Sequence, residues 1–237
     1  MITLTCTHTT VMYHDWVVDG RTASQASFAD YITTVGVAET CNIGFNYNAI
    51  VGWLPWRAVF HFEKNFDGYV KIDDFSPSVA SLTVGVHEPA QNSVGDRDEV
   101  RCAFMYDMNT ASGDNILALE SWNDFGWNTQ SNSITFNTLA DPMLKTITWP
   151  TSTDTNDNRT NRFKIEDYLN RTDQTHVGIM MFGAQDWSAL EVDNGGSNTE
   201  PDAAAQIMIT ATHAYTDATM RPQLFLNASL ATQRPMF

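Results

Sequence analysis

Alternation of large apolar and polar side chains over short segments is the feature that most restricts the fold of this chain. The clearest case is residues 56–63, WRAVFHFE. One face would carry Trp56, Ala58, Phe60 and Phe62, and the other Arg57, His61 and Glu63 together with Val59. A period of two is that of a β-strand, because successive side chains of a strand point to opposite faces. We therefore expect a half-buried strand here.

Similar segments recur along the chain. Residues 100–106 and 207–212 alternate in the same way, and residues 79–86, 176–182 and 222–227 are typical of short buried strands. Gly, Asn, Asp and Ser cluster between them, as in turns. Helical periodicity is weak, and the best candidate is a short turn over 162–169. The pattern predicts an all-β fold, an antiparallel β-sandwich or jelly roll with long loops and at most one or two short helical turns.

Nothing in the sequence divides the chain into separate units. There is no internal repeat and no Pro/Gly/Ser-rich linker, and the polar stretch 150–161 fits a long surface loop within one domain. We expect a single β-sandwich domain over residues 1–237, with a strand-like N-terminal arm at about 1–20 and a C-terminal tail at about 228–237.

The net charge of the chain limits the kinds of partner that it can bind. The chain has 13 Lys and Arg against 28 Asp and Glu, a formal net charge of −15. Such a surface repels phosphate backbones, so we expect no nucleic acid as partner. Residues 1–20 have neither a basic nor an apolar region of a signal peptide, and no apolar run approaches the ~20 residues of a membrane span. We expect a soluble chain without a secretory signal or a membrane partner.

The cysteines and histidines do not form a recognisable metal motif. Cys6, Cys41 and Cys102 are odd in number and have no CxxC spacing, which favours buried reduced thiols and folding in a reducing cytoplasm. The six histidines are scattered along the chain. The stretch 154–158 resembles a calcium loop in its oxygen side chains but lacks the Gly and Glu of an EF-hand, which favours a solvated turn. We predict no metal site and no cofactor.

Signatures of catalysis are equally lacking. The chain has no GxSxG, no GxxxxGK[ST] and no GxGxxG. Adjacent carboxylates such as Asp73 and Asp74, or Asp96 and Asp98, could in principle serve a glycosidase, but 28 acids produce such pairs by chance. We predict no catalytic residue and no enzyme activity.

Tryptophan is the residue type most able to contact a sugar ring or a partner. Most of the seven tryptophans are expected in the core. Trp127 and Trp187 have polar or acidic neighbours and are the two that we predict as ligand contacts.

Several segments, in order, resemble one family, the DNRLRE-type β-sandwich, which is related to certain carbohydrate-binding modules. The matching pieces are Asn42-Ile43-Gly44, 57–62, 81–84, Trp122, 133–137, 163–169, 178–182 and 221–226. The resemblance covers roughly residues 40–227, with Phe136 where the family usually has Trp. The resemblance implies an adhesive or structural module without catalytic residues, of the kind found on secreted enzymes, surfaces and virions; it carries over no sugar-contact position.

These observations lead to one principal function and two alternatives. A virion protein folds in the host cytoplasm and works outside the cell, which would reconcile an extracellular type of sandwich with a chain that has no secretory signal. We therefore expect a bacteriophage structural protein, a capsid decoration or fibre component. We expect it in multiple copies or as a homo-oligomer. Its partners would be other virion proteins, with a glycan as a further candidate ligand. The ends supply predicted docking residues, Ile2 and Leu4 in a strand that could join a neighbour's sheet, and Met236 and Phe237 in the tail. The alternatives are a free-standing carbohydrate-binding module or lectin and, third, a polysaccharide-active enzyme.

Overall fold

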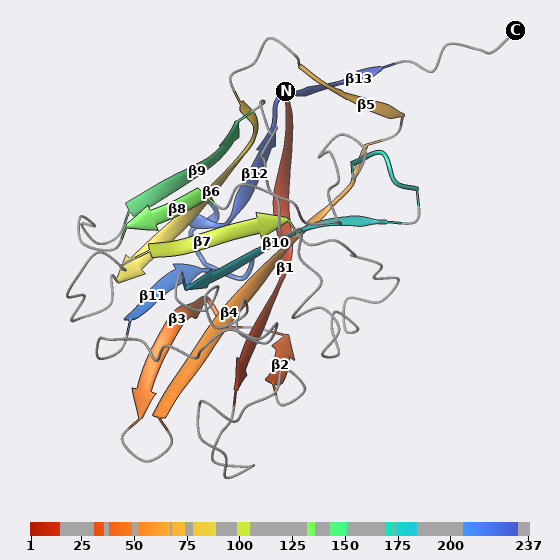
Figure 1. Ribbon diagram of the computed structural model, residues 1–237. Helices are drawn as coiled ribbons and strands as arrows, with labels where there is room; N and C mark the ends of the chain where they lie inside the picture. The colour runs from red at the N-terminus through yellow and green to blue at the C-terminus, as the bar shows by residue number, and fades with distance from the viewer. Residues whose placement is uncertain are drawn as a thin grey trace, which may run out of the picture.

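The computed structural model describes a set of antiparallel strands and their nearest connections (Figure 1). The described residues are 1–14, 31–35, 38–48, 52–66, 68–73, 78–88, 99–104, 132–135, 143–150, 169–172, 174–183 and 206–231.

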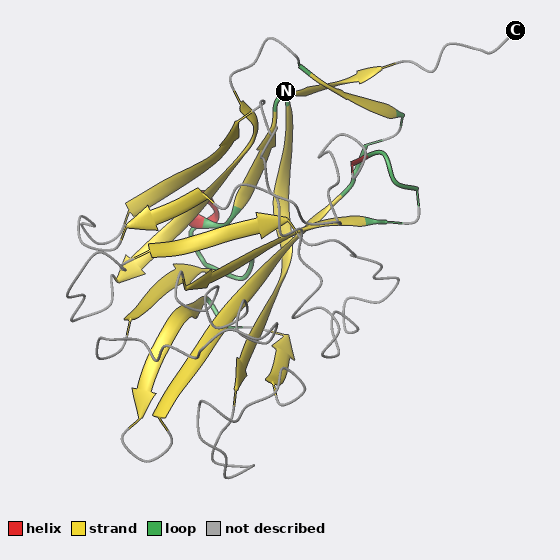
Figure 2. Cartoon of the chain, viewed as in Figure 1, coloured by secondary structure: helices red, strands yellow, loops and turns green. Residues whose placement is uncertain are grey.

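Thirteen strands and one 3₁₀ turn make up these segments (Figure 2). In chain order they are β1 (Ile2–His14), β2 (Tyr31–Val35), β3 (Thr40–Asn48), β4 (Gly52–Glu63), β5 (Tyr69–Ile72), β6 (Ser78–Glu88), β7 (Glu99–Phe104), β8 (Asn132–Thr135), β9 (Met143–Pro150), β10 (His176–Gly183), β11 (Gln206–Ala211), η5 (Ala218–Met220), β12 (Gln223–Leu226) and β13 (Ala228–Ala231).

Six strands close into a ring in the order β1-β12-β6-β11-β3-β4, because β4 pairs again with β1. Three branches leave this ring: β2 pairs with β1, β9 pairs with β6, and β10, β7 and β8 continue in that order from β4. Every one of these pairings is antiparallel. The prediction of an antiparallel all-β fold is confirmed at this level, and the closed ring is a feature that the sequence analysis did not anticipate.

The core is built from cross-strand rows of apolar residues. One row runs Leu4, Leu224, Leu82 and Ile147 across β1, β12, β6 and β9, and each of these side chains is at most 2% exposed. Burial of such rows removes apolar area from water, the main favourable contribution to folding. The rings of Phe104 on β7 and Trp149 on β9 meet edge to face with centroids 5.0 Å apart, so strands that are not paired to each other pack across this core.

The prediction that β4 is half-buried is wrong. Ala58, Phe60 and Phe62 are buried as expected, but Arg57, Val59 and His61 on the opposite face are also no more than 1% exposed. Val59 is opposite Met180 in the register with β10, and Met180 and Phe182 are buried too, so this face of the two strands is covered and not open to solvent. Arg57 is accommodated there by contacts with Met180 and the ring of Phe182.

The strands β6 and β12 are less buried than the sequence predicts. Their residues were expected to form short strands that are buried on both faces. Leu224 and Leu226 are buried, whereas Gln223 and Phe225 between them are only half-buried, and Ser81 and Thr83 are placed likewise. One face of these strands therefore faces outward. For β10 the prediction of a buried strand is confirmed, since Val177 through Phe182 are all buried.

The ends of the chain differ from the expected arm and tail. The structure places Ile2–His14 within the sheet as β1, paired with β12, β4 and β2. Ala228–Ala231 pairs with β5 as a small second sheet beyond one end of the main sheet (Figure 1). Residues 162–168 of the expected helical turn lie outside the described segments, as do residues 232–237. In the part of the chain that the structure describes, no helix combines the length and apolarity needed to cross a membrane.

Candidate functional site

An uncharged outward face covers four neighbouring strands, β1, β12, β6 and β9. It consists of two cross-strand rows, here called the hydroxyl face: Thr3, Phe225, Ser81 and Thr148 in one row, and Thr5, Gln223, Thr83 and Thr146 in the next. Directly opposed residues of paired strands point to the same side of a sheet. The eight side chains therefore share one face, opposite the buried row that begins at Leu4.

The hydroxyl face is chemically uniform. Six of its eight residues are Thr or Ser, one is Gln and one is Phe, and none is ionisable. Thr3, Thr5, Thr146 and Thr148 on the two outer strands are exposed, and the four central residues are half-buried. The hydroxyls of Thr83 and Thr146 are joined by a hydrogen bond of 3.0 Å. The face thus offers hydroxyl and amide groups around one aromatic ring.

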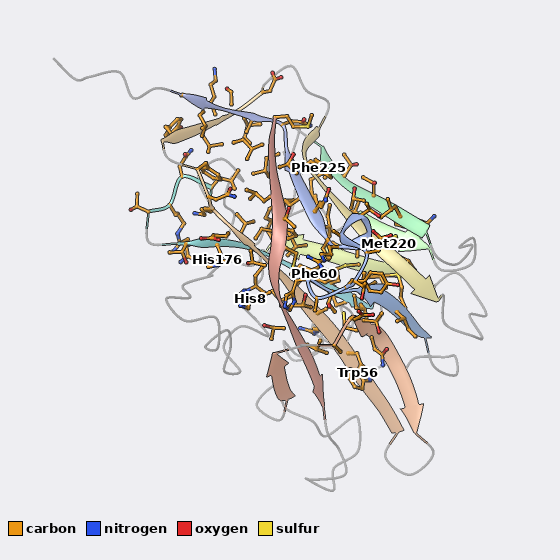
Figure 3. All side chains as sticks on the ribbon, turned by 180° about the vertical axis from the view of Figure 1, so that it is seen from behind. His8, Trp56, Phe60, His176, Met220 and Phe225 are labelled. Carbon is orange, nitrogen blue, oxygen red and sulfur yellow. The ribbon has the colours of Figure 1, made fainter. Side chains whose placement is uncertain are left out.

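The loop after β11 borders this face. Gly85 continues the outward alternation of Ser81 and Thr83, and Met220 lies against it; Figure 3 labels Met220 and Phe225 on the side of β12 and β6. The loop is held by its own hydrogen bonds. Asp217 accepts from the backbone N–H and the hydroxyl of Thr219 at 2.9 and 2.7 Å, and the Arg221 side chain donates to the carbonyl of Tyr215 at 2.7 Å. A fixed ridge therefore bounds one end of the face.

Four histidines that are far apart in the sequence meet where β1 pairs with β4. His8 is opposite His61 in the β1–β4 register, next to an irregularity between Cys6 and His8. The His8 and His213 rings stack with centroids 5.6 Å apart. Figure 3 shows His8 and His176 on this part of the molecule. We call His8, His61, His176 and His213 the histidine cluster.

Threonines of β1 tie the cluster to the sheet. The Thr10 hydroxyl and Nε2 of His61 are 3.0 Å apart, and the Thr9 hydroxyl lies 3.2 Å from both the backbone N–H and Nδ1 of His213. His176 is next to Glu63 in the β10–β4 register, and its Nδ1 is 2.8 Å from the Thr175 hydroxyl.

Burial and the neighbouring positive charges disfavour protonation of three histidines of this cluster, His61, His176 and His213. Desolvation lowers the pKa of His61 to about 3, and the charges of His176, His8 and His213 act in the same direction. The pKa of His176 is lowered by desolvation and raised in part by Glu63, and desolvation and His8 lower the pKa of His213. Among the described residues no group of three or more His, Cys, Asp or Glu is arranged to hold a metal ion. His61, His176 and His213 thus present neutral imidazoles at neutral pH.

The three thiols agree with the expectation of buried, reduced cysteines. Cys6, Cys41 and Cys102 are all free and buried. Desolvation raises the pKa of Cys6 to about 12 and of Cys41 to about 11, and raises the pKa of Cys102 as well. Because the thiolate is the reactive form, these thiols are chemically inert in the folded protein.

The residues predicted from the sequence as contact sites are placed as follows. Leu4 is 1% exposed in the core and Ile2 packs partly against it, because their strand pairs with β12 of the same chain. The structure therefore places this pair in the fold of one chain, and the docking role of their strand stays a prediction. Trp127, Trp187, Met236 and Phe237 lie outside the described residues.

The hydroxyl face was missed at the sequence level. Its signal was present in the alternation of threonines at Thr3, Thr5 and Thr7 and of Thr146 with Thr148. The sequence does not show that these strands are neighbours, since β1, β6, β9 and β12 are far apart along the chain. The histidine cluster could not be predicted either, because its four residues are also far apart along the chain.

Comparison with known proteins adds no relative. No model of a protein family matches the sequence, and no curated protein matches it. The resemblance to the DNRLRE-type β-sandwich stays a prediction.

Proposed function

We propose that this chain is a non-enzymatic structural and adhesive protein that makes its contacts through the hydroxyl face. The observation that carries this proposal is the contrast between that face, whose eight residues have no charge, and a chain with a formal net charge of −15. A surface free of like charge is where an acidic protein can approach a partner at the least electrostatic cost.

We further propose that the ring and its branches form a β-sandwich of the jelly-roll type, with β9, β6, β12 and β1 as one layer and β4, β10, β7 and β8 as the other. The contact between Phe104 and Trp149 supports two facing layers, because it joins β7 to β9 across the core.

Within the structural and adhesive class, we propose a bacteriophage virion component, a capsid decoration or fibre protein. The three buried free thiols support folding in a reducing compartment. The resemblance to an adhesive sandwich family supports a role on an exterior surface. A virion protein combines the two, since it folds inside the host and works outside.

Density-gradient fractionation tests the virion proposal. Particles from a lysate of the native source would be separated, and the chain followed by immunoblot. We expect it to sediment with the particles and to remain there after washing in moderate salt. Recovery of the chain only as a free, slowly sedimenting species would contradict the proposal.

A free-standing carbohydrate-binding module is the second candidate, and Phe225 is the observation that favours it. A half-buried aromatic ring among hydroxyl and amide groups is typical of a surface that binds sugars. The two candidates share a surface and differ in context: the module would be free in solution and the virion protein would not.

A further inference from the structure

We propose that the hydroxyl face is a binding site for a neutral, hydroxyl-rich polysaccharide whose chain lies across strands β1, β12, β6 and β9. This inference rests on the proposed adhesive function and names the ligand of its surface. It uses residues that are distinct from Trp127 and Trp187.

The size of the face argues for a narrow ligand. Four strands at ~4.8 Å spacing and two rows at ~6.8 Å spacing cover roughly 250–300 Å². A stable protein–protein interface buries about 800 Å² per partner, well above this area. A protein partner would need surface beyond this face for a stable contact, whereas a single extended polymer needs only a strip.

The chemistry of the face selects the class of polymer. Phe225 is half-buried and supplies an aromatic ring that can pack against the C–H groups of a sugar, with Thr3 and Ser81 on either side of it in the same row. Gln223, next to it in the second row, supplies an amide that can both donate and accept. The Thr and Ser hydroxyls of the face can both donate and accept hydrogen bonds, and so can the hydroxyls of a sugar. A hydroxyl-rich polymer is therefore the class of ligand that fits this face.

Charge excludes acidic polymers from this site. A net charge of −15 repels carboxylated or sulfated chains, and the eight residues of the face are neutral. Arg221, in the loop that borders the face, donates to the Tyr215 carbonyl. Lys145 of β9 does not add a positive charge to the hydroxyl face. It is opposite Val84 in the register, and the buried side chain of Val84 marks the other face of the sheet. The ligand is therefore uncharged.

The geometry also fixes its direction. Each row runs perpendicular to the strands, from the exposed Thr3 or Thr5 on β1 to the exposed Thr148 or Thr146 on β9. Met220 on Gly85 bounds the second row at its far side (Figure 3). A polymer bound along the rows would pass over Phe225 and leave the face at both outer strands.

Affinity electrophoresis of the full chain tests this proposal with two sets of probes, neutral polymers (glucans, mannans, galactans and xylan) and acidic polymers (alginate and polygalacturonate). Phe225→Leu removes the ring but keeps an apolar side chain, and Thr83→Glu adds a charge at the centre of the face. Ser229→Glu is the matched control, because Ser229 is exposed on β13, outside the face. Circular dichroism would verify that each variant is folded.

We expect the wild type and Ser229→Glu to bind at least one neutral polymer, and Phe225→Leu and Thr83→Glu to bind it at least tenfold more weakly. The proposal would be overturned if the two face variants bound as tightly as the wild type, if the wild type preferred acidic polymers, or if the wild type bound no polymer.

Two further readouts separate this inference from the proposed function. If Thr83→Glu disrupts sedimentation with particles while no polymer is bound, the face is a protein contact, and the adhesive function stands without its glycan. Release of reducing ends from a bound polymer by the wild type would instead overturn the non-enzymatic function.

Discussion

Gly85 shows how closely the loop after β11 approaches the sheet. A Cβ atom at this position would lie 2.7 Å from the Met220 carbonyl oxygen and less than 3 Å from two of its side-chain atoms. Real Cβ contacts are not this short, so the ridge beside the hydroxyl face requires glycine. The reason is space and not conformation: the described glycines with positive φ are Gly44 and Gly68.

Gly85→Ala is therefore expected to destabilise the protein by about 1–3 kcal/mol, the usual cost of overpacking. Urea unfolding monitored by tryptophan fluorescence would measure it. Adding Met220→Ala should restore little, because the backbone oxygen and Cβ of residue 220 remain in place. Full recovery in the double variant would show that only the methionine side chain is obstructive.

At the scale of elements, β1 shows why one face of a strand cannot be exchanged for the other. Leu4 is 1% exposed in the apolar row, whereas Thr3 beside it is exposed on the hydroxyl face. The strand is also paired by its backbone to β12. It is therefore an integral part of the core and the rim of the candidate site.

Leu4→Ala should cost about 2–5 kcal/mol in the free energy of unfolding, as large-to-small changes in a core do. Thr3→Ala should change stability by less than ~0.5 kcal/mol, as is usual on a surface. Both are measured by denaturant unfolding of the purified chain at low concentration. A near-neutral Leu4→Ala would instead indicate a strand that docks on a neighbour, as the sequence alone suggested.

Much of the element pattern was predictable. The six segments 56–63, 79–86, 100–106, 176–182, 207–212 and 222–227 all contain strands, because local alternation and apolar runs depend on neighbouring residues. Which faces are buried was not predictable for β4 or β6. Burial of a face depends on what packs against it, and that is set by residues remote in the sequence.

At the scale of the whole molecule, the histidine cluster couples stability to pH. In the folded state the pKa of His61 is lowered to about 3 by burial, against an ordinary value of 6.5. Between these values the unfolded chain binds a proton that the folded protein does not. The free energy of unfolding is therefore highest, as far as His61 is concerned, above pH 6.5, and it declines as the pH falls below that value. The lowered pKa values of His176 and His213 act in the same sense.

We expect the free energy of unfolding to decrease below pH 6.5 by about 1.4 kcal/mol per pH unit for His61. Urea titrations at pH 8, 6.5 and 5 would measure the slope. His61→Gln should flatten it, and the comparison at pH 8 isolates the loss that is unrelated to protonation. Of the charged groups around the cluster, Glu63 raises the pKa of His176 and so tempers the effect, whereas Lys64 lowers the pKa of His176 and Arg221 lowers that of His213, which strengthens it. An unchanged slope in this variant would refute the assignment.

Local properties of the protein can be read from its residues alone: where strands form, the excess of acidic residues and the spacing of cysteines that favours free thiols. These follow from periodicity, composition and cysteine spacing, which short stretches of chain carry in full. The row of Thr3, Phe225, Ser81 and Thr148 and the meeting of four scattered histidines become visible only in the folded chain. Both assemblies arise from strand order and register, which depend on long-range pairing that no local pattern encodes.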